Sequence, residues 1–279
     1  MPKLYFASTD IAALGQHAYL VYDLNGDLSS LDDQIIYRAG PATNNFLNFG
    51  NIIIEPGFLN YNAIDPLDVS EDTLDINESG SDDGGDDTTT DRNYYDINST
   101  DAAQDRVIIE NWINSFGSPT VGNPNNGTID TGLSYHLFEQ NSNSVITTAL
   151  SLIGKNFKDI ASQNIIPSYD KFAAWTTIID GQGNETYTLF NNGFFESYKV
   201  LDQNGNDTFI IEKGTNVAFD LDGDLTTSNK LILKDVDPNK VVLNKIGSSL
   251  YVGGDGTDII LHNFFDSSLT GNAGGDLEI

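Results

Sequence analysis

The feature that most constrains the fold is a change of sequence texture after Trp175. From Thr176 onward, short apolar runs rich in β-branched and aromatic residues alternate with turns made of Asp, Gly and Asn. This alternation is typical of short strands joined by tight turns. Residues 176–279 are therefore predicted to form an all-β domain, separate from an α+β domain formed by residues 1–175.

Three of these turns share one frame. Residues 253–261 read GGDGTDIIL, which matches the nine-residue calcium β-roll repeat GGxGxDxUx at every fixed position. Residues 202–210 and 180–188 keep part of the pattern, with Glu185 in place of the Asp in the latter. In such a repeat the glycine-rich half turns tightly, the Asp and backbone carbonyls bind calcium, and the next apolar residue points inward.

The carboxylates in these turns are the candidate calcium ligands. The segment DLDGD, residues 220–224, resembles the first half of a calcium loop, although no Glu follows at the spacing of an EF-hand. The frames begin 22 and 51 residues apart, whereas β-roll turns stack nine residues apart, so residues 253–261 fit a plain β-hairpin turn equally well. The candidate ligands are Asp180, Glu185, Asp202, Asp207, Asp220, Asp222, Asp224, Asp255 and Asp258.

The charge of the chain favours the same cofactor, Ca²⁺. The formal net charge is −28, and 32 of the 41 acidic residues are Asp, which suits tight turns and oxygen-rich metal loops. Repulsion at this charge disfavours nucleic acid and anionic membrane surfaces as partners. The chain has no Cys, which excludes disulfides, zinc-thiolate sites and a cysteine nucleophile.

Residues 1–175 read as strands followed by helices. HAYLVYD and QIIYRAG flank an Asp/Asn/Gly turn and predict an antiparallel hairpin, with a third strand at 51–55. Residues 65–96 carry one basic residue and few apolar ones, so they are predicted to be a disordered acidic insertion. Amphipathic patterns predict helices from about 100 to 116, capped by Ser99 or Thr100, and from Asn141 or Ser142 to a stop at Gly154.

The start of the second predicted helix is a candidate catalytic position. A hydroxyl at Ser142 lies at the positive end of the helix dipole, beside backbone N–H groups that can hold an oxyanion. An ordinary helix cap explains the same residue types.

Around this position the first 155 residues resemble the circularly permuted papain-like fold of the lecithin:retinol acyltransferase type. That family carries a His on an early strand and a Tyr-x-Leu-x-x-x-Asn-Cys-Asn motif at a helix start. The matching positions are His17, Tyr135, Leu137, Asn141, Ser142 and Asn143. Ser142 stands where the family has its Cys, and a hydroxyl is a weaker nucleophile than a thiolate.

The resemblance implies an α+β domain with an antiparallel sheet and an acyl-transfer or hydrolysis reaction on an amide or ester. It implies that Ser142 is the nucleophile and His17 the base, with Tyr135, Asn141 and Asn143 as motif residues around the oxyanion site. A third, orienting residue is expected on the following strand, at Gln34 or Arg38.

The last hundred residues resemble the C-terminal region of RTX proteins. LYVGGDGTDIILHNFF is similar to the hairpin that often follows RTX repeats. The resemblance implies a secreted, extracellular bacterial protein that binds calcium and is exported by type I secretion machinery. The N-terminal segment lacks the pattern of a cleaved secretory leader, and no stretch approaches the length of a membrane span. A non-catalytic calcium-dependent adhesion or binding module with an inactive papain-like scaffold is the alternative.

Overall fold

The computed structural model describes residues 1–11, 15–28, 33–41, 51–58, 93–116, 129–134, 142–157, 160, 176–191, 197–201, 205–220 and 229–265. The contacts divide the chain into two compact units, residues 1–146 with 160–175 and residues 147–159 with 176–279. Strands and helices are mixed, as the α+β prediction requires. The division after Trp175 falls at the change of sequence texture, while residues 147–159, which lie before that change, join the second unit.

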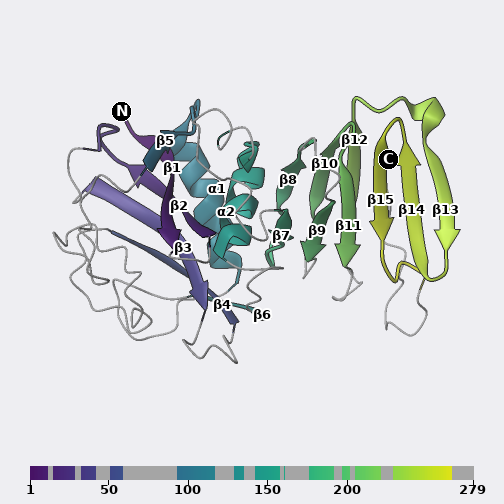
Figure 1. Ribbon diagram of the computed structural model, residues 1–279, viewed down its shortest axis with the longest axis horizontal. Coiled ribbons are helices and arrows are strands. Elements are labelled where there is room, and N and C mark those ends of the chain that lie inside the picture. Colours follow the sequence, from purple (N-terminus) through teal and green to yellow (C-terminus); the bar gives the residue numbers. More distant parts are fainter. Residues whose placement is uncertain are drawn as a thin grey trace. The chain divides into compact units, whose positions relative to one another are not determined.

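The first unit contains one antiparallel sheet of six strands. Its order is β5-β1-β2-β3-β4-β6, as Figure 1 shows. The strands are β1 (Lys3–Ile11), β2 (Gly15–Asp23), β3 (Gln34–Pro41), β4 (Asn51–Phe58), β5 (Asn93–Asp96) and β6 (Ile129–Ser134).

Two of these strands correct the sequence-based prediction. β5 takes the last four residues of the segment predicted to be disordered, because Tyr94 and Tyr95 pair with β1 and half bury their rings. Residues 65–92 lie outside the described residues. β6 lies between the two predicted helices, where no strand was predicted, and it pairs with β4.

The predicted hairpin is formed by β2 and β3, and one buried carboxylate closes it. Asp23 lies opposite Gln34 in the register of the two strands and exposes only 1% of its surface. Its Oδ1 accepts the backbone N–H groups of Asn25 and Gly26, and its Oδ2 accepts that of Leu28. The polar groups of the turn are thereby satisfied by the chain itself, which fixes the hairpin.

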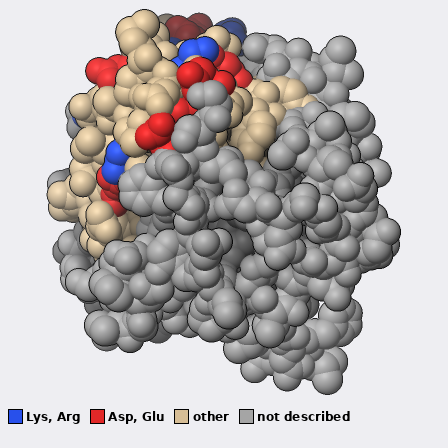
Figure 2. All heavy atoms as spheres, turned by 90° about the vertical axis from the view of Figure 1, so that its left-hand side faces the viewer, with Lys and Arg blue, Asp and Glu red and all other residues tan. Residues whose placement is uncertain are grey.

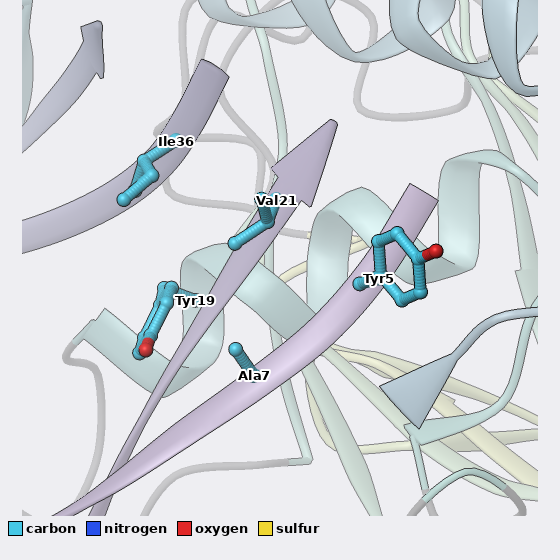
Figure 3. Close-up of a cluster of buried hydrophobic side chains, with 5 residues drawn as sticks. All are labelled: Tyr5, Ala7, Tyr19, Val21 and Ile36. Carbon is cyan, nitrogen blue, oxygen red and sulfur yellow. The ribbon is translucent and has the colours of Figure 1, made fainter. Parts of the chain in front are cut away.

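Both faces of the sheet are buried. Figure 3 shows the cluster on one face, formed by Tyr5, Ala7, Tyr19, Val21 and Ile36. Strand residues alternate between faces, so Leu20, Tyr22 and Tyr37 point to the other side.

Helix α1 (Ala102–Ser115) packs on that other face. Its Arg106 lies 5.1 Å from the centroid of the Tyr22 ring, and its Glu110 accepts the Tyr37 hydroxyl at 2.8 Å. The helix begins at Ala102, about two residues later than predicted, because Asp101, not Ser99 or Thr100, caps it and accepts the N–H of Gln104.

Charges on the described surface of the first unit are partly paired. Lys3 lies 2.8 Å from Asp96, and Arg106 lies 2.8 Å from Glu110. In Figure 2 basic and acidic side chains lie next to one another on the face shown. Such exposed pairs contribute little stability.

Helix α2 (Ser142–Leu152) is the second predicted helix, and the boundary between the units falls within it. All side chains from Asn143 to Leu152 are buried. Gly154 has a φ of +67° and ends the helix as predicted, with the N–H of Lys155 bonded to the carbonyl of Leu150. Within the second unit, Thr148 accepts the N–H of Ile179 and Ser151 donates to the carbonyl of Thr188.

The second unit is a coil of short parallel strands that alternate between two sheets. The smaller sheet has the order β12-β10-β8, and the larger one β13-β14-β15-β11-β9-β7 (Figure 1). The parallel strands are β7 (Thr177–Ile179), β8 (Thr186–Leu189), β9 (Tyr198–Leu201), β10 (Thr208–Glu212), β11 (Asn216–Asp220) and β12 (Lys230–Lys234). Each passage from one sheet to the other and back forms one turn of a solenoid.

Residues of the smaller sheet stack on residues 22 positions later. Thr186 pairs with Thr208, which pairs with Lys230. The inward residues Tyr187, Phe209 and Leu231 are 0 to 2% exposed, and the rings of Tyr187 and Phe209 stack with centroids 5.2 Å apart. The alternation of inward apolar and outward polar residues therefore builds the core of the coil.

The coil ends in antiparallel strands. After a short 3₁₀ helix, η3 (Pro238–Lys240), come β13 (Val242–Ile246), β14 (Ser249–Gly254) and β15 (Thr257–Leu261). Gly254 pairs with Thr257 across the two-residue turn Asp255-Gly256, whose φ angles are +54° and +88°. Of the two readings of residues 253–261, the structure shows the hairpin.

Candidate metal centre

The turns that lead into β8 and β10 bring three carboxylates together. Asp180 follows β7 and Glu185 precedes β8 in the first turn, while Asp207 precedes β10 in the next. Because the coil repeats after 22 residues at this edge, Asp207 lies beside Glu185, and its Oδ1 accepts the Glu185 backbone N–H at 2.7 Å. Stacking thus joins residues from two turns into one site.

The three side chains can each offer an oxygen to one cation. One carboxylate oxygen of each lies within 4.8 Å of the other two. Asp180 and Asp207 are buried at 0% and 1% exposure, and Glu185 is half-buried. Oxygen ligands around a shared point are the donors preferred by hard divalent cations. This buried acidic triad could hold a metal ion.

A buried tyrosine positions the deepest of these carboxylates. The Tyr187 hydroxyl donates to Asp180 Oδ1 at 2.7 Å and accepts the Gly181 N–H at 3.1 Å. Burial, with the nearby Asp180 charge, raises the pKa of Tyr187 well above its usual value. The phenol therefore stays protonated and remains a donor. It thereby fixes the orientation of the Asp180 carboxylate within the triad.

The electrostatics of the triad favour a bound positive charge. Burial and the adjacent Asp207 carboxylate raise the pKa of Glu185 from 4.5 to about 7. Its Oε2 atom is buried and has no hydrogen-bond partner. Ionised carboxylates this close repel one another in a partly dry site, so one must take up a proton or all must share a cation.

Of the other sequence-predicted ligands, the structure describes three, and none of these three joins this group. Asp202, Asp222 and Asp224 lie outside the described residues. Asp220 ends β11 and pairs with Leu201 of β9 in the larger sheet. Of the described carboxylates, the triad contains neither Asp220 nor the two of the β14–β15 hairpin.

The two hairpin carboxylates have other partners. Asp255 lies 2.5 Å from Lys213 and 2.8 Å from Lys240, and the hydrogen bonds from these ammonium groups lower its pKa to about 2. Asp258 accepts the hydroxyl of Tyr251. Lysines beside Asp255 supply the positive charge that a calcium ion would otherwise bring, because they neutralise the carboxylate directly.

In the first unit, His17 and Ser142 each precede one member of a hydrogen-bonded pair, Ala18 and Asn143. His17 lies in β2, opposite Thr9 of β1, and Ser142 begins α2. The residues that follow them are joined, since the Ala18 N–H donates to Asn143 Oδ1 at 3.0 Å in a buried hydrogen bond. The side chains of His17 and Ser142 are not among those described.

Of the other residues of the expected catalytic group, Gln34 is placed away from this point. Gln34 lies opposite Asp23, six residues along β2 from His17, which corresponds to roughly 20 Å along a strand. The side chain of Gln34 is buried at that position, at 1% exposure. The backbone of Arg38 pairs with that of Glu55 in β4, and its side chain is not among those described. Tyr135 and Asn141 lie outside the described residues.

Sequence reasoning missed two features of the metal centre. The first is the hydroxyl of Tyr187, because the repeat predicts only an inward-pointing apolar residue at the position after the Asp. The second feature is the stacking distance, whose signal is visible in the parallel between residues 180–191 and 202–213. At this spacing the Asn206 N–H donates to Asn184 Oδ1, and the Asp207 N–H donates to Asn229 Oδ1.

Comparison of the chain with protein-family models, with curated proteins and with solved structures finds no match. Within the described part of the chain, neither helix has the length and apolar character needed to cross a membrane.

Proposed function

We propose that this chain is an exported bacterial calcium-binding protein whose β-rich second unit is held together by calcium at Asp180, Glu185 and Asp207. The observation that carries the proposal is the convergence of three carboxylates from two stacked turns. A cation there links successive turns of the coil, so binding and folding of this unit are coupled. Millimolar extracellular calcium then favours the folded unit outside the cell, in keeping with the RTX resemblance and export by type I secretion.

Calcium suits the site better than magnesium. Magnesium demands a near-ideal octahedron of short bonds and gives up its waters reluctantly, whereas calcium accepts six to eight oxygens in irregular arrangements. The three carboxylates supply three such oxygens, and water can complete the shell on the side of Glu185, which is only half-buried. Zinc and copper are disfavoured by the all-oxygen ligand set.

Calorimetric titration of the full-length, metal-free chain with calcium tests this proposal. We expect binding that Asp207→Asn weakens by tenfold or more, because the substitution removes a ligand charge at the centre of the triad. Asp258→Asn is the matched control, since Asp258 was an equally good candidate from sequence but lies outside the triad. A chain that binds no calcium, or loses as much affinity in the control as in Asp207→Asn, would contradict the assignment.

A second candidate function is acyl transfer or hydrolysis by the first unit, on an amide or ester. The hydrogen bond from the Ala18 N–H to Asn143 Oδ1 favours it, because it ties the strand carrying His17 to the start of the helix carrying Ser142. In this proposal His17 acts as the base, Ser142 as the nucleophile, and the helix N-terminus stabilises the oxyanion. The competing proposal is a calcium-dependent adhesion or binding module in which this domain is an inactive scaffold.

Activity toward a panel of p-nitrophenyl esters and amides distinguishes the acyl-transfer or hydrolysis proposal from the binding-module proposal. We expect Ser142→Ala and His17→Ala each to lower turnover by at least a hundredfold, since the two groups act as one unit. Gln34→Ala is the control and is expected to leave the chemistry intact, because Gln34 in β3 lies opposite Asp23, six residues along β2 from His17. Equal turnover by the Ser142 and His17 variants and the unaltered chain would leave the binding module as the function.

A further inference from the structure

Strand β13, at the end of the larger sheet in the second unit, has exposed side chains on both faces and, among the described residues, a neighbouring strand on one edge only. All five of its residues are exposed, and Val242, Leu243 and Ile246 expose 53%, 54% and 60% of their surface. Among the described residues β13 pairs only with β14, and it is the outermost strand of its sheet in Figure 1. An open edge with apolar side chains is a template for pairing with another strand.

The register of the β13–β14 hairpin decides which backbone groups face the open edge. Ile246 and Ser249 flank a two-residue turn and therefore form a hydrogen-bonded pair. Hydrogen-bonded and non-hydrogen-bonded pairs alternate along antiparallel strands, so Asn244 and Val242 also bond toward β14. The N–H and C=O groups of Leu243 and Lys245 consequently point outward.

We propose that β13 pairs antiparallel with β13 of a second copy of this chain, about a twofold axis at Asn244. The outward groups of Leu243 then bond with those of Lys245 in the other copy, and Val242 lies opposite Ile246. Asn244 faces its own counterpart, and the two side-chain amides can donate to and accept from each other. In this register apolar side chains meet across the axis and no like charges lie opposite one another.

The charge of the described residues around β13 permits this association, although the formal net charge of the whole chain is −28. The described residues from 229 to 265 hold as many lysines as acidic residues. The lysines are Lys230, Lys234, Lys240 and Lys245, and the acidic residues are Asp235, Asp237, Asp255 and Asp258. The described residues 229–265 therefore carry no net formal charge, so among them there is no net repulsion toward the same residues of a second copy.

Sedimentation of the full-length chain with calcium, in about 0.15 M salt to screen long-range repulsion, tests the register through two substitutions at one position. Leu243→Lys places two lysines opposite each other twice in the dimer, and we expect dimerisation roughly tenfold weaker or worse. Leu243→Glu faces Lys245 of the other copy instead, and the dimer is expected to persist. If β13 associated only through apolar contacts without this register, both substitutions at Leu243 would weaken the dimer equally. Equal weakening, or a monomeric unaltered chain at every concentration, overturns the proposal.

Cysteine cross-linking provides an independent measurement, since the natural chain has no Cys. In the proposed register Asn244→Cys brings two sulfurs together at a closely spaced pair, and mild oxidation is expected to yield a covalent dimer. Leu243→Cys is the matched control, because its counterpart lies two residues away along the partner strand, beyond disulfide reach. Cross-linking of the control as readily as of Asn244→Cys overturns the register.

Discussion

Calcium is expected to raise the free energy of unfolding by about 2.7 kcal/mol at pH 8 when the free ion exceeds its dissociation constant a hundredfold. This corresponds to an increase of about 5 to 10 °C in the midpoint of thermal unfolding for a chain of this size. At pH 5 the same calcium concentration is expected to have little effect, because protons compete for the triad.

The pH dependence follows from Glu185. Its pKa is raised from 4.5 to about 7 in the metal-free folded chain, so between these values the folded state holds a proton that the unfolded state has lost. Without calcium, stability is therefore full below pH 4.5 and declines as the pH rises to 7. Because Glu185 is only half-buried, the decline is about 1 to 2 kcal/mol. Calcium binds the ionised triad, so the stability that calcium adds to the folded chain increases as the pH rises from 4.5 to 7.

Urea unfolding at pH 5, 6, 7 and 8, with calcium or with a chelator, measures both effects. Glu185→Gln is the informative variant, since it removes the titrating group and keeps the shape of the side chain. In the chelator we expect it to remove the decline between pH 5 and 7. A decline of unchanged size in Glu185→Gln would show that another group causes it.

Gly205→Ala is expected to destabilise the second unit by about 3 to 5 kcal/mol. Gly205 has a φ of +127°, a backbone conformation that residues with a side chain rarely adopt. A Cβ at this position would also lie 1.7 Å from the carbonyl oxygen of Gly183 in the preceding turn. Neither the Cβ nor the carbonyl oxygen can rotate away, because both are attached directly to the backbone. The clash is therefore relieved only by separating the two turns. Separation also moves Asp207 away from Glu185, and calcium affinity should fall together with stability.

Gly247→Ala is the matched control for this prediction. Gly247 also has a positive φ, +62°, but no atom lies within 4 Å of the position that its Cβ would take. The expected cost is about 1 kcal/mol, the cost of the left-handed backbone alone. Urea unfolding of the two variants with and without calcium compares them. Similar losses in both would show that turns 183 and 205 are not stacked as closely as described.

Local sequence patterns determined much of the secondary structure of this protein. Gly154 ends α2 where the pattern required it, because a left-handed residue is needed there and glycine adopts it without penalty. The β2–β3 hairpin and the change to short strands and tight turns after Trp175 were also predicted from local sequence. These features depend on residues adjacent in sequence, so no distant contact has to be known.

Pairing with distant strands decided what local pattern could not. The segments 93–96 and 129–134 have weak strand signals, yet β1 and β4 order them. The place of Gln34 likewise depended on register, since a strand displaces each successive residue by about 3.3 Å and only the pairing with Asp23 fixes how far it lies from His17.

The metal centre shows the same division. The sequence by itself placed Asp180, Glu185 and Asp207 in tight acidic turns and made them candidate calcium ligands, but it made Asp255 and Asp258 equally good candidates. Only the tertiary structure selected among them, because the length of one coil is set by how the inward residues Tyr187 and Phe209 stack in the core. That stacking fixes an offset of 22 residues between the turns at this edge, which brings Asp207 to Glu185, while the antiparallel hairpin places Asp255 beside two lysines.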